Sequence, residues 1–479
     1  MTRDPIIDRA EEDVKNMMKG KKEEEKKYEI SLIETKTAIY EQASYDANDE
    51  SECKMVIKFL RYDKKTEEVE TVEEVEFEGK NYVPIDNKLV LKKRVNLPTK
   101  TEEYGTDQEL VKEISNFLFT YFQVPKFYEV LLPYIVLFYW IADQFPFIPY
   151  LHFVGLPATG KSTALDVMGS ICYKAIKSGG AVTVASIFRI ANQWKGTLLI
   201  NEFEVGEKGS DLARSLVQLL KSGVEDDPLY RVEGEGKKDI ELYELKAPRI
   251  FASQEEIDNA ALQSRTIMVK LDKNKKRLPL YRLPAFKIKA QELINKLTLW
   301  RFRHFNSINL EEIEFGIPEL EGFDRRVQQV LTPIYHLADA EAKKTIVELV
   351  KQQEEETKRE RLEGQDGQII EFIFKELAEM VLPKDVTLAD ITSQLNTTRS
   401  KYQKDLSEKE VGTYIRKVLH LKVTKKMYGA VIEISDKEIT QFEEYYGITV
   451  EGFKNNPDQA EPEKTEEPED EGGLKWDEN

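Results

Sequence analysis

The sequence predicts an α/β protein: a parallel sheet with flanking helices, preceded by a small β-rich domain and followed by a helical unit with a hairpin. Three observations support this prediction. An apolar run at residues 150–154 is followed by a glycine-rich loop and then by helical spacing. Residues 28–98 are rich in Val, Ile, Thr and aromatic side chains, several of them alternating with charged ones. Residues 364–450 hold amphipathic helices and end in an alternating stretch around a glycine.

Composition limits the class of protein. A chain of 479 residues is expected to hold two to four domains. Its net charge of −18 argues against a chain that is basic throughout, but it is compatible with a local basic face. Two cysteines, and four histidines without ligand spacing, argue against a disulfide framework and a zinc ribbon. Without a secretory signal or an apolar segment of bilayer length, we expect a cytoplasmic protein with no membrane partner.

The N-terminal part is expected to hold a charged helical lead-in at residues 1–27 and a β-rich domain at 28–98. Its strands are expected at residues 30–39, 54–62, 70–78 and 89–94.

A helical connector is expected at residues 99–145. Thr106 or Asp107 can cap its first helix, and Pro125 separates that helix from an apolar one at 127–142. Aromatic side chains crowd this segment. We interpret them as core residues in preference to a platform for stacking bases.

The loop at residues 155–163 fits the pattern G-x-x-x-x-G-K-[ST]. Its glycines let successive backbone N–H groups face a phosphate chain, and the following helix adds the positive end of its dipole. The lysine reaches the β- and γ-phosphates, and the next hydroxyl binds Mg²⁺. We therefore expect residues 146–272 to be a nucleotide-binding core for ATP and Mg²⁺. The predicted binding residues are Gly155, Pro157, Ala158, Thr159, Gly160, Lys161, Ser162 and Thr163.

The ends of two further apolar strands resemble those of additional-strand ATPases. In such proteins the second strand usually ends in an aspartate that supports Mg²⁺ and a glutamate that polarises the attacking water. Here Asn201 and Glu202 stand at these places, so the resemblance implies Glu202 as the catalytic base and Asn201 as an uncharged metal support. A third strand, at 247–252, precedes Ser253 and Gln254. The resemblance implies Gln254, with Ser253 in reserve, as the sensor of the γ-phosphate; the alternative is two ordinary loop residues.

Two cationic features follow. The order Leu-x-Ser-Arg ending at Arg265 resembles the arginine finger of ring-forming helicases, which stabilises charge on the γ-phosphate of a neighbouring subunit. It implies a homo-oligomer, expected as a hexameric ring; the alternative is a surface ion pair. Residues 229–243 predict a hairpin with Lys237 and Lys238 at a glycine tip, suited to DNA phosphates. An exposed hairpin without a partner is equally compatible.

On these motifs, residues 127–345 resemble the AAA+ ATPases of mobile-element replication proteins, akin to superfamily III and minichromosome-maintenance helicases. The segments that carry the resemblance are residues 149–151, 155–163, 196–202 and 262–265. The resemblance also implies that a helical lid and linker occupies residues 273–362. Within it, Arg326, or alternatively Arg325, is implied as a second sensor of the nucleotide.

The C-terminal unit at 364–450 predicts three helices and a hairpin, an order that looks like a winged helix. Ser407 and Glu410 fit a capping box for its third helix. Between residues 397 and 427, nine Lys and Arg stand against three acids, a local +6. This basic face is expected to bind DNA, single- or double-stranded; the alternative is a winged helix that contacts protein. The expected contacts are Lys409, Arg416, Lys417, Lys425 and Lys426. The acidic residues 456–479 are expected to be disordered.

Taken together, these features predict an ATPase that drives DNA translocation or unwinding, as a ring-forming replicative helicase of a plasmid, virus or integrated element. One alternative is a non-motor AAA+ switch, such as a loader or origin-binding factor, which the uncharged Asn201 favours. Another is a signalling or defence ATPase whose winged helix binds protein.

Overall fold

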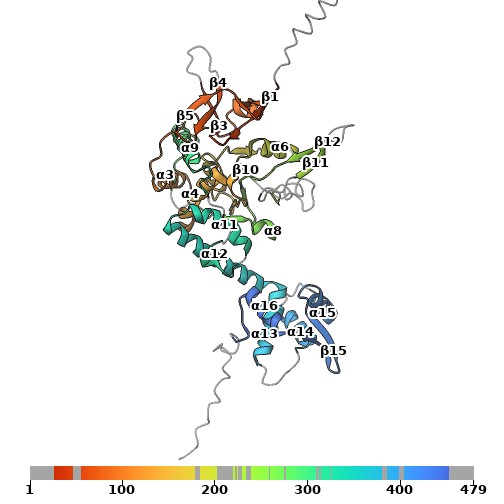
Figure 1. Cartoon of the computed structure of the whole chain (residues 1–479). Helices are drawn as coiled ribbons and strands as arrows, with labels where there is room; N and C mark the ends of the chain where they lie inside the picture. Colours follow the sequence, from red (N-terminus) through yellow and green to blue (C-terminus); the bar gives the residue numbers. More distant parts are fainter. Residues whose placement is uncertain are drawn as a thin grey trace, which may run out of the picture. The chain divides into compact units, whose positions relative to one another are not determined.

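The chain divides into two compact units, Met1–Leu349 and Val350–Asn479 (Figure 1). None of the helices within the described ranges has the length and apolarity needed to cross a bilayer. The computed structural model describes residues 26–46, 55–178, 184–201, 220–221, 224, 229–233, 239–257, 259–273, 277–308, 311, 313, 316–323, 325–379, 386–398 and 404–451.

Two small sheets form the start of the first unit. The three-stranded sheet has the order β1 (Lys27–Ile30), β7 (Lys80–Pro84) and β6 (Val75–Phe77). The four-stranded antiparallel sheet runs β2 (Leu32–Glu34), β3 (Ala38–Asp46), β4 (Met55–Asp63) and β5 (Val69–Val72). The predicted strand at 89–94 is wrong, because the Asn87 side chain accepts hydrogen bonds from the N–H groups of Leu89 and Val90 and starts the short helix α2 (Lys88–Leu91).

The segment expected to be a helical connector contains two α-helices. Thr106 and Glu109 form a capping box at the start of α3 (Asp107–Tyr121), and α4 (Lys126–Ile141) follows. The 3₁₀ turn η1 (Ala142–Gln144) comes next. Phe138, Tyr139 and Trp140 of this segment are core residues, at most 2% exposed, whereas Phe147 is half-buried.

A five-stranded parallel sheet lies at the centre of the first unit. Its order is β14 (Thr266–Lys270), β8 (Tyr150–Val154), β13 (Arg249–Ser253), β10 (Leu198–Asn201) and β9 (Ile176–Ser178). Every residue of β8 and β13 is buried, as expected for strands covered on both faces. The register pairs Ser253 with Val154 and Asn201 with Ala252, so the carboxyl ends of β8, β13 and β10 lie at one edge.

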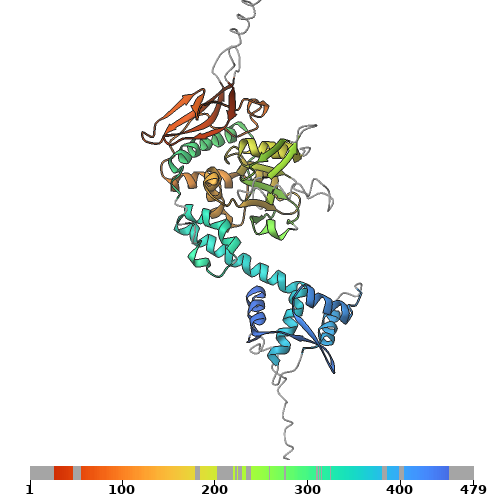
Figure 2. The same cartoon turned by 45° about the vertical axis from the view of Figure 1, so that its right-hand side comes forward.

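Helices flank this sheet and extend the first unit. They are α5 (Lys161–Gly169), α6 (Val184–Trp194), α8 (Ala260–Gln263), α9 (Pro284–His304), η2 (Pro318–Leu320), α11 (Arg325–Leu337) and α12 (Ala340–Glu363), within which the boundary between the units falls. Figure 2 shows α9 beneath the four-stranded sheet, where Tyr62 stacks on Phe302 with ring centroids 5.1 Å apart. The predicted hairpin forms from β11 (Leu229–Glu233) and β12 (Asp239–Tyr243).

Buried charges join the N-terminal sheets to the rest of the first unit. Glu41 of β3 forms ion pairs with Lys174 Nζ at 2.6 Å and Arg301 Nε at 3.5 Å. It also accepts a hydrogen bond from the Tyr173 hydroxyl at 2.9 Å. Arg301, on α9, also donates to both carboxylate oxygens of Asp143, at 2.9 and 2.6 Å. Burial alone would raise the pKa of Asp143, but the Arg301 cation holds it below its usual value. Four segments of the chain thus meet in one network.

The second unit contains the predicted helices and hairpin. They are α13 (Gln365–Glu379), α14 (Leu388–Thr398), α15 (Glu408–Lys417), β15 (Lys422–Lys426) and β16 (Gly429–Glu433). Ser407 and Glu410 form the expected capping box. A further helix, α16 (Asp436–Tyr446), was not predicted, although Ser435 and Glu438 form a second box of the same kind. Apolar residues from the helices and the hairpin share one core.

Candidate functional site

The predicted glycine loop joins β8 to α5 at the carboxyl edge of the parallel sheet. Ala158 and Gly160 adopt left-handed conformations, with φ of 65° and 93°. A Cβ at Gly155 would lie 2.4 Å from the carbonyl oxygen of Leu271, so this approach of two backbones requires glycine. Gly160 is the N-cap of α5 and offers no side-chain cap, so the first N–H groups of the helix face the loop. Such a helix start favours an anion.

Lys161 lies in the curve of this loop. Its Nζ donates to the carbonyl oxygens of Gly155 at 2.6 Å and Leu156 at 2.7 Å. Burial lowers the pKa of Lys161 from its ordinary value. The ammonium group is therefore held by neutral oxygens that belong to the loop itself, beside the start of α5.

The two predicted metal-binding residues meet although 39 positions separate them. The Ser162 hydroxyl donates to Asn201 Oδ1 at 3.0 Å, which joins the first turn of α5 to the end of β10. The pair supplies two neutral oxygens, and among the described residues no cluster of three His, Cys, Asp or Glu could hold a metal. Mg²⁺ often keeps several waters and takes few protein ligands when phosphates complete its shell, so this donor set fits a phosphate-bound Mg²⁺. Glu202, the predicted base, lies outside the described residues.

The end of β13 lies at the same edge. The Ser253 hydroxyl donates its single proton to the carbonyl oxygen of Glu255, so the ring nitrogen of His152 at 2.6 Å must donate to it. Burial lowers the pKa of His152 to about 4, which keeps this ring neutral. Gln254 follows Ser253 and is exposed. Gln254, the first choice as sensor, is therefore accessible to a ligand, whereas the Ser253 hydroxyl is buried and already hydrogen-bonded within the chain.

Arg265 lies beside the amino-terminal ends of the parallel strands, whereas the glycine loop follows the carboxyl end of β8. The carbonyl oxygen of Arg265 accepts from the N–H of Tyr150, at the amino end of β8. β14 then runs alongside β8 to Lys270, opposite Val154 and next to the loop. Five residues of strand span about 16 Å, which is longer than an arginine side chain. Arg265 is therefore placed away from the glycine loop of its own chain.

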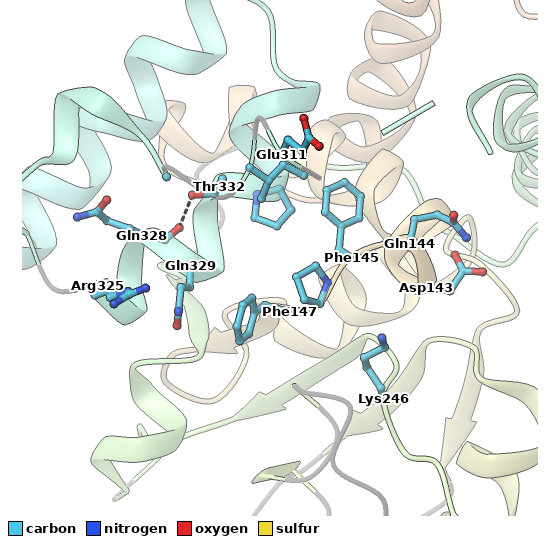
Figure 3. Close-up of a pocket in the computed structure, with 14 residues that line it drawn as sticks. Asp143, Gln144, Phe145, Phe147, Lys246, Glu311, Arg325, Gln328, Gln329 and Thr332 are labelled. Atoms are coloured by element: carbon cyan, nitrogen blue, oxygen red, sulfur yellow. Dashed lines mark hydrogen bonds between the residues drawn. The ribbon is translucent and has the colours of Figure 1, made fainter. Parts of the chain in front are cut away.

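Arg325 also lies on that far side. It lines a pocket of about 670 Å³ with Phe145 and Phe147, which lead into β8, and Lys246, which precedes β13 (Figure 3). Arg325 is not brought to the glycine loop, so a sensor role toward its own nucleotide gains no support. The side chain of Arg326, the first choice for that role, is outside the described part.

The predicted DNA-binding residues belong to two elements. Lys237 and Lys238 fall outside the described residues. In the second unit, Arg416 and Lys417 occupy the last turn of α15, which packs against β15. The other predicted contacts in this unit, all exposed, are Lys409, Lys425 and Lys426.

Comparisons with known proteins give only similar structures. No family model matches the chain, and no curated protein matches it. The A form of the apo C-terminal region of NrS-1 is similar with a TM-score of 0.39 and 17% identity, over 75% of this chain and 81% of that one. An apo structure of its residues 305–718 gives 0.38 and 18%, over 76% and 82%.

Proposed function

We propose that this chain is an ATPase whose nucleotide site is the glycine loop between β8 and α5. The observation that carries the proposal is the meeting of Lys161, Ser162 and Asn201 at the carboxyl edge of a parallel sheet. Crevices at that edge are where open α/β sheets bind ligands. The loop fits the Walker pattern, and the conformations at Ala158 and Gly160 are the ones a phosphate cradle needs.

The loop residues have distinct tasks in this proposal. Backbone N–H groups at the start of α5 bind the phosphates, and Lys161 exchanges two neutral carbonyl oxygens for phosphate oxygens, which accept stronger, charge-assisted bonds. Ser162 and Asn201 hold Mg²⁺, which neutralises phosphate charge when bound. Gln254 contacts the γ-phosphate, and Glu202 positions the attacking water. The strand β13 lies between β8 and β10, so the carboxyl ends of all three strands lie beside one another.

The position of Arg265 favours catalysis shared between subunits. The glycine loop of the same chain lies at the opposite ends of the parallel strands, so an arginine finger at Arg265 acts on a neighbouring subunit's nucleotide. Repeated head-to-tail contacts form a ring when the rotation between neighbouring subunits closes. We further propose that this chain forms such a ring and, with its basic second unit, acts as an ATP-driven DNA motor that translocates along or unwinds DNA.

Mixing two inactive variants tests the shared site. Arg265→Ala and Lys161→Ala are each expected to lose ATP hydrolysis. Mixed in equal amounts, they should recover about a quarter of the parent rate, because that share of random interfaces joins an intact loop to an intact finger. The measurement is the steady-state ATPase rate after mixing, with each variant mixed with itself as the control. A mixture no more active than its components would remove the shared site.

Strand displacement tests the motor against its rival. The neutral Asn201 favours a non-motor switch with slow hydrolysis, because an amide stabilises the metal less than a carboxylate does. The motor predicts ATP-dependent unwinding of a forked duplex, and Asn201→Asp is expected to raise the rate. DNA binding without unwinding, in both the parent and Asn201→Asp, would identify a switch.

A further inference from the structure

The hairpin of the second unit ends in two large apolar side chains. β15 and β16 are closed by the two-residue turn Met427–Tyr428, which projects beyond the helices of this unit in both views (Figures 1 and 2). Met427 is completely exposed, at 105%, and Tyr428 is 65% exposed. Met427 is the most exposed large apolar residue in the described part of the chain. The tip therefore presents about two side chains of apolar surface to solvent.

Neither turn geometry nor core packing accounts for these two residues. Two-residue hairpin turns favour Asn, Asp and Gly, whereas Met and Tyr gain nothing from the turn itself. The hairpin is anchored by other residues, because Val423, Ala430 and Ile432 belong to the core of the unit and the tip does not. Substitution at the tip is therefore expected to leave the fold intact.

The charges around the tip indicate the chemistry of its partner. Lys425 and Lys426 stand directly before the tip. The acid of the hairpin, Glu433, lies at the far end of the ladder, where it receives Lys422 at 2.7 Å. Arg416 and Lys417, in the last turn of α15, lie beside the start of β15 and not at the tip. An apolar tip next to two lysines matches a partner with a negatively charged surface and an apolar interior. Duplex DNA has this combination, with phosphates outside and stacked bases inside.

We propose that Met427 and Tyr428 form a wedge that inserts between the stacked bases of duplex DNA. Lys425 and Lys426 would hold the flanking phosphates during insertion. Apolar side chains used in this way unstack base steps, and aromatic rings gain stacking energy with the displaced bases. This inference rests on the proposed DNA-binding function and adds to it the residues that open the duplex.

The test uses the full chain without ATP and a forked duplex that carries 2-aminopurine at the fork and in the stem. Unstacking raises the fluorescence of this base, and anisotropy over a salt series gives affinity. The tip variant is Met427→Ser with Tyr428→Ser. The matched control is Tyr445→Ser, an exposed tyrosine on α16 of the same unit. The double variant Lys425→Ala with Lys426→Ala separates the effect of phosphate contacts on binding from the effect of inserting the tip.

The parent and Tyr445→Ser are expected to raise the fluorescence, and the tip variant to lose that rise. The tip variant should bind about tenfold more weakly with an unchanged salt slope, whereas the lysine variant should reduce the slope by about two. A tip variant that still raises the fluorescence overturns the wedge alone. A tip variant that binds DNA normally but changes oligomeric state also overturns it, in favour of a contact between subunits. If the parent does not bind the duplex at all, the DNA-binding proposal falls with it.

Discussion

Replacing Arg301 with methionine is expected to lower the free energy of unfolding of the first unit by about 3–5 kcal/mol. The side chain is fully buried, and its loss leaves the buried carboxylate of Glu41 with Lys174 as its remaining cationic partner. Methionine keeps part of the packing against Tyr173, so the effect is mainly that of uncompensated buried charge.

Denaturant unfolding followed by tryptophan fluorescence measures this effect. Three of the four tryptophans, Trp140, Trp194 and Trp300, are buried in the first unit, so the change in signal reports mainly its transition. Arg303→Met is the matched control on the same helix, because Arg303 pairs with Glu103 at the surface, and this change should cost within about 1 kcal/mol. Equal midpoints for both variants would show that the network does not stabilise the unit.

Replacing Lys161 with alanine is expected to reduce ATP turnover at least about a hundredfold. In the proposed site its ammonium group binds the β- and γ-phosphates, where charge accumulates during phosphoryl transfer. The bonds that Lys161 makes in the structure go only to carbonyl oxygens of its own loop, so the fold should survive the change. The loss of ATP turnover therefore reflects a slower chemical step and not a less stable fold.

Steady-state phosphate release with saturating Mg²⁺ gives this rate. Lys195→Ala is the matched control, since Lys195 is an exposed lysine of the same unit that pairs with Glu244. It is expected to hydrolyse ATP as the parent does. A Lys161→Ala protein that also keeps the parent rate would place hydrolysis elsewhere in the chain.

Local patterns in the sequence predicted local structure well. The strand before the glycine-rich loop, the helix after it and the capping boxes at Thr106 and Ser407 are confirmed, because each depends on residues within a few positions of one another. The strand expected at 89–94 failed for a local reason as well. The cap at Asn87 outweighed the β preference of the residues that follow it.

Contacts between distant segments could not be predicted in the same way. Glu41 and Lys174 are joined by the fold and leave no spacing in the sequence. The meeting of Ser162 with Asn201 was predictable only because the loop pattern assigned Ser162, and the resemblance of the second strand assigned Asn201, to the same metal ion. The edge of the sheet at which Arg325 lies depends on packing around α11, which no motif encodes.

Calorimetric titration of MgATP into the full chain tests the central claim most directly. The account predicts binding of roughly one ATP per chain, weakened at least about tenfold by Lys161→Ala and unchanged by Lys195→Ala. Absence of binding to the parent, or equal affinity in the parent and Lys161→Ala, would contradict the claim that the loop from Gly155 to Ser162 is the nucleotide site.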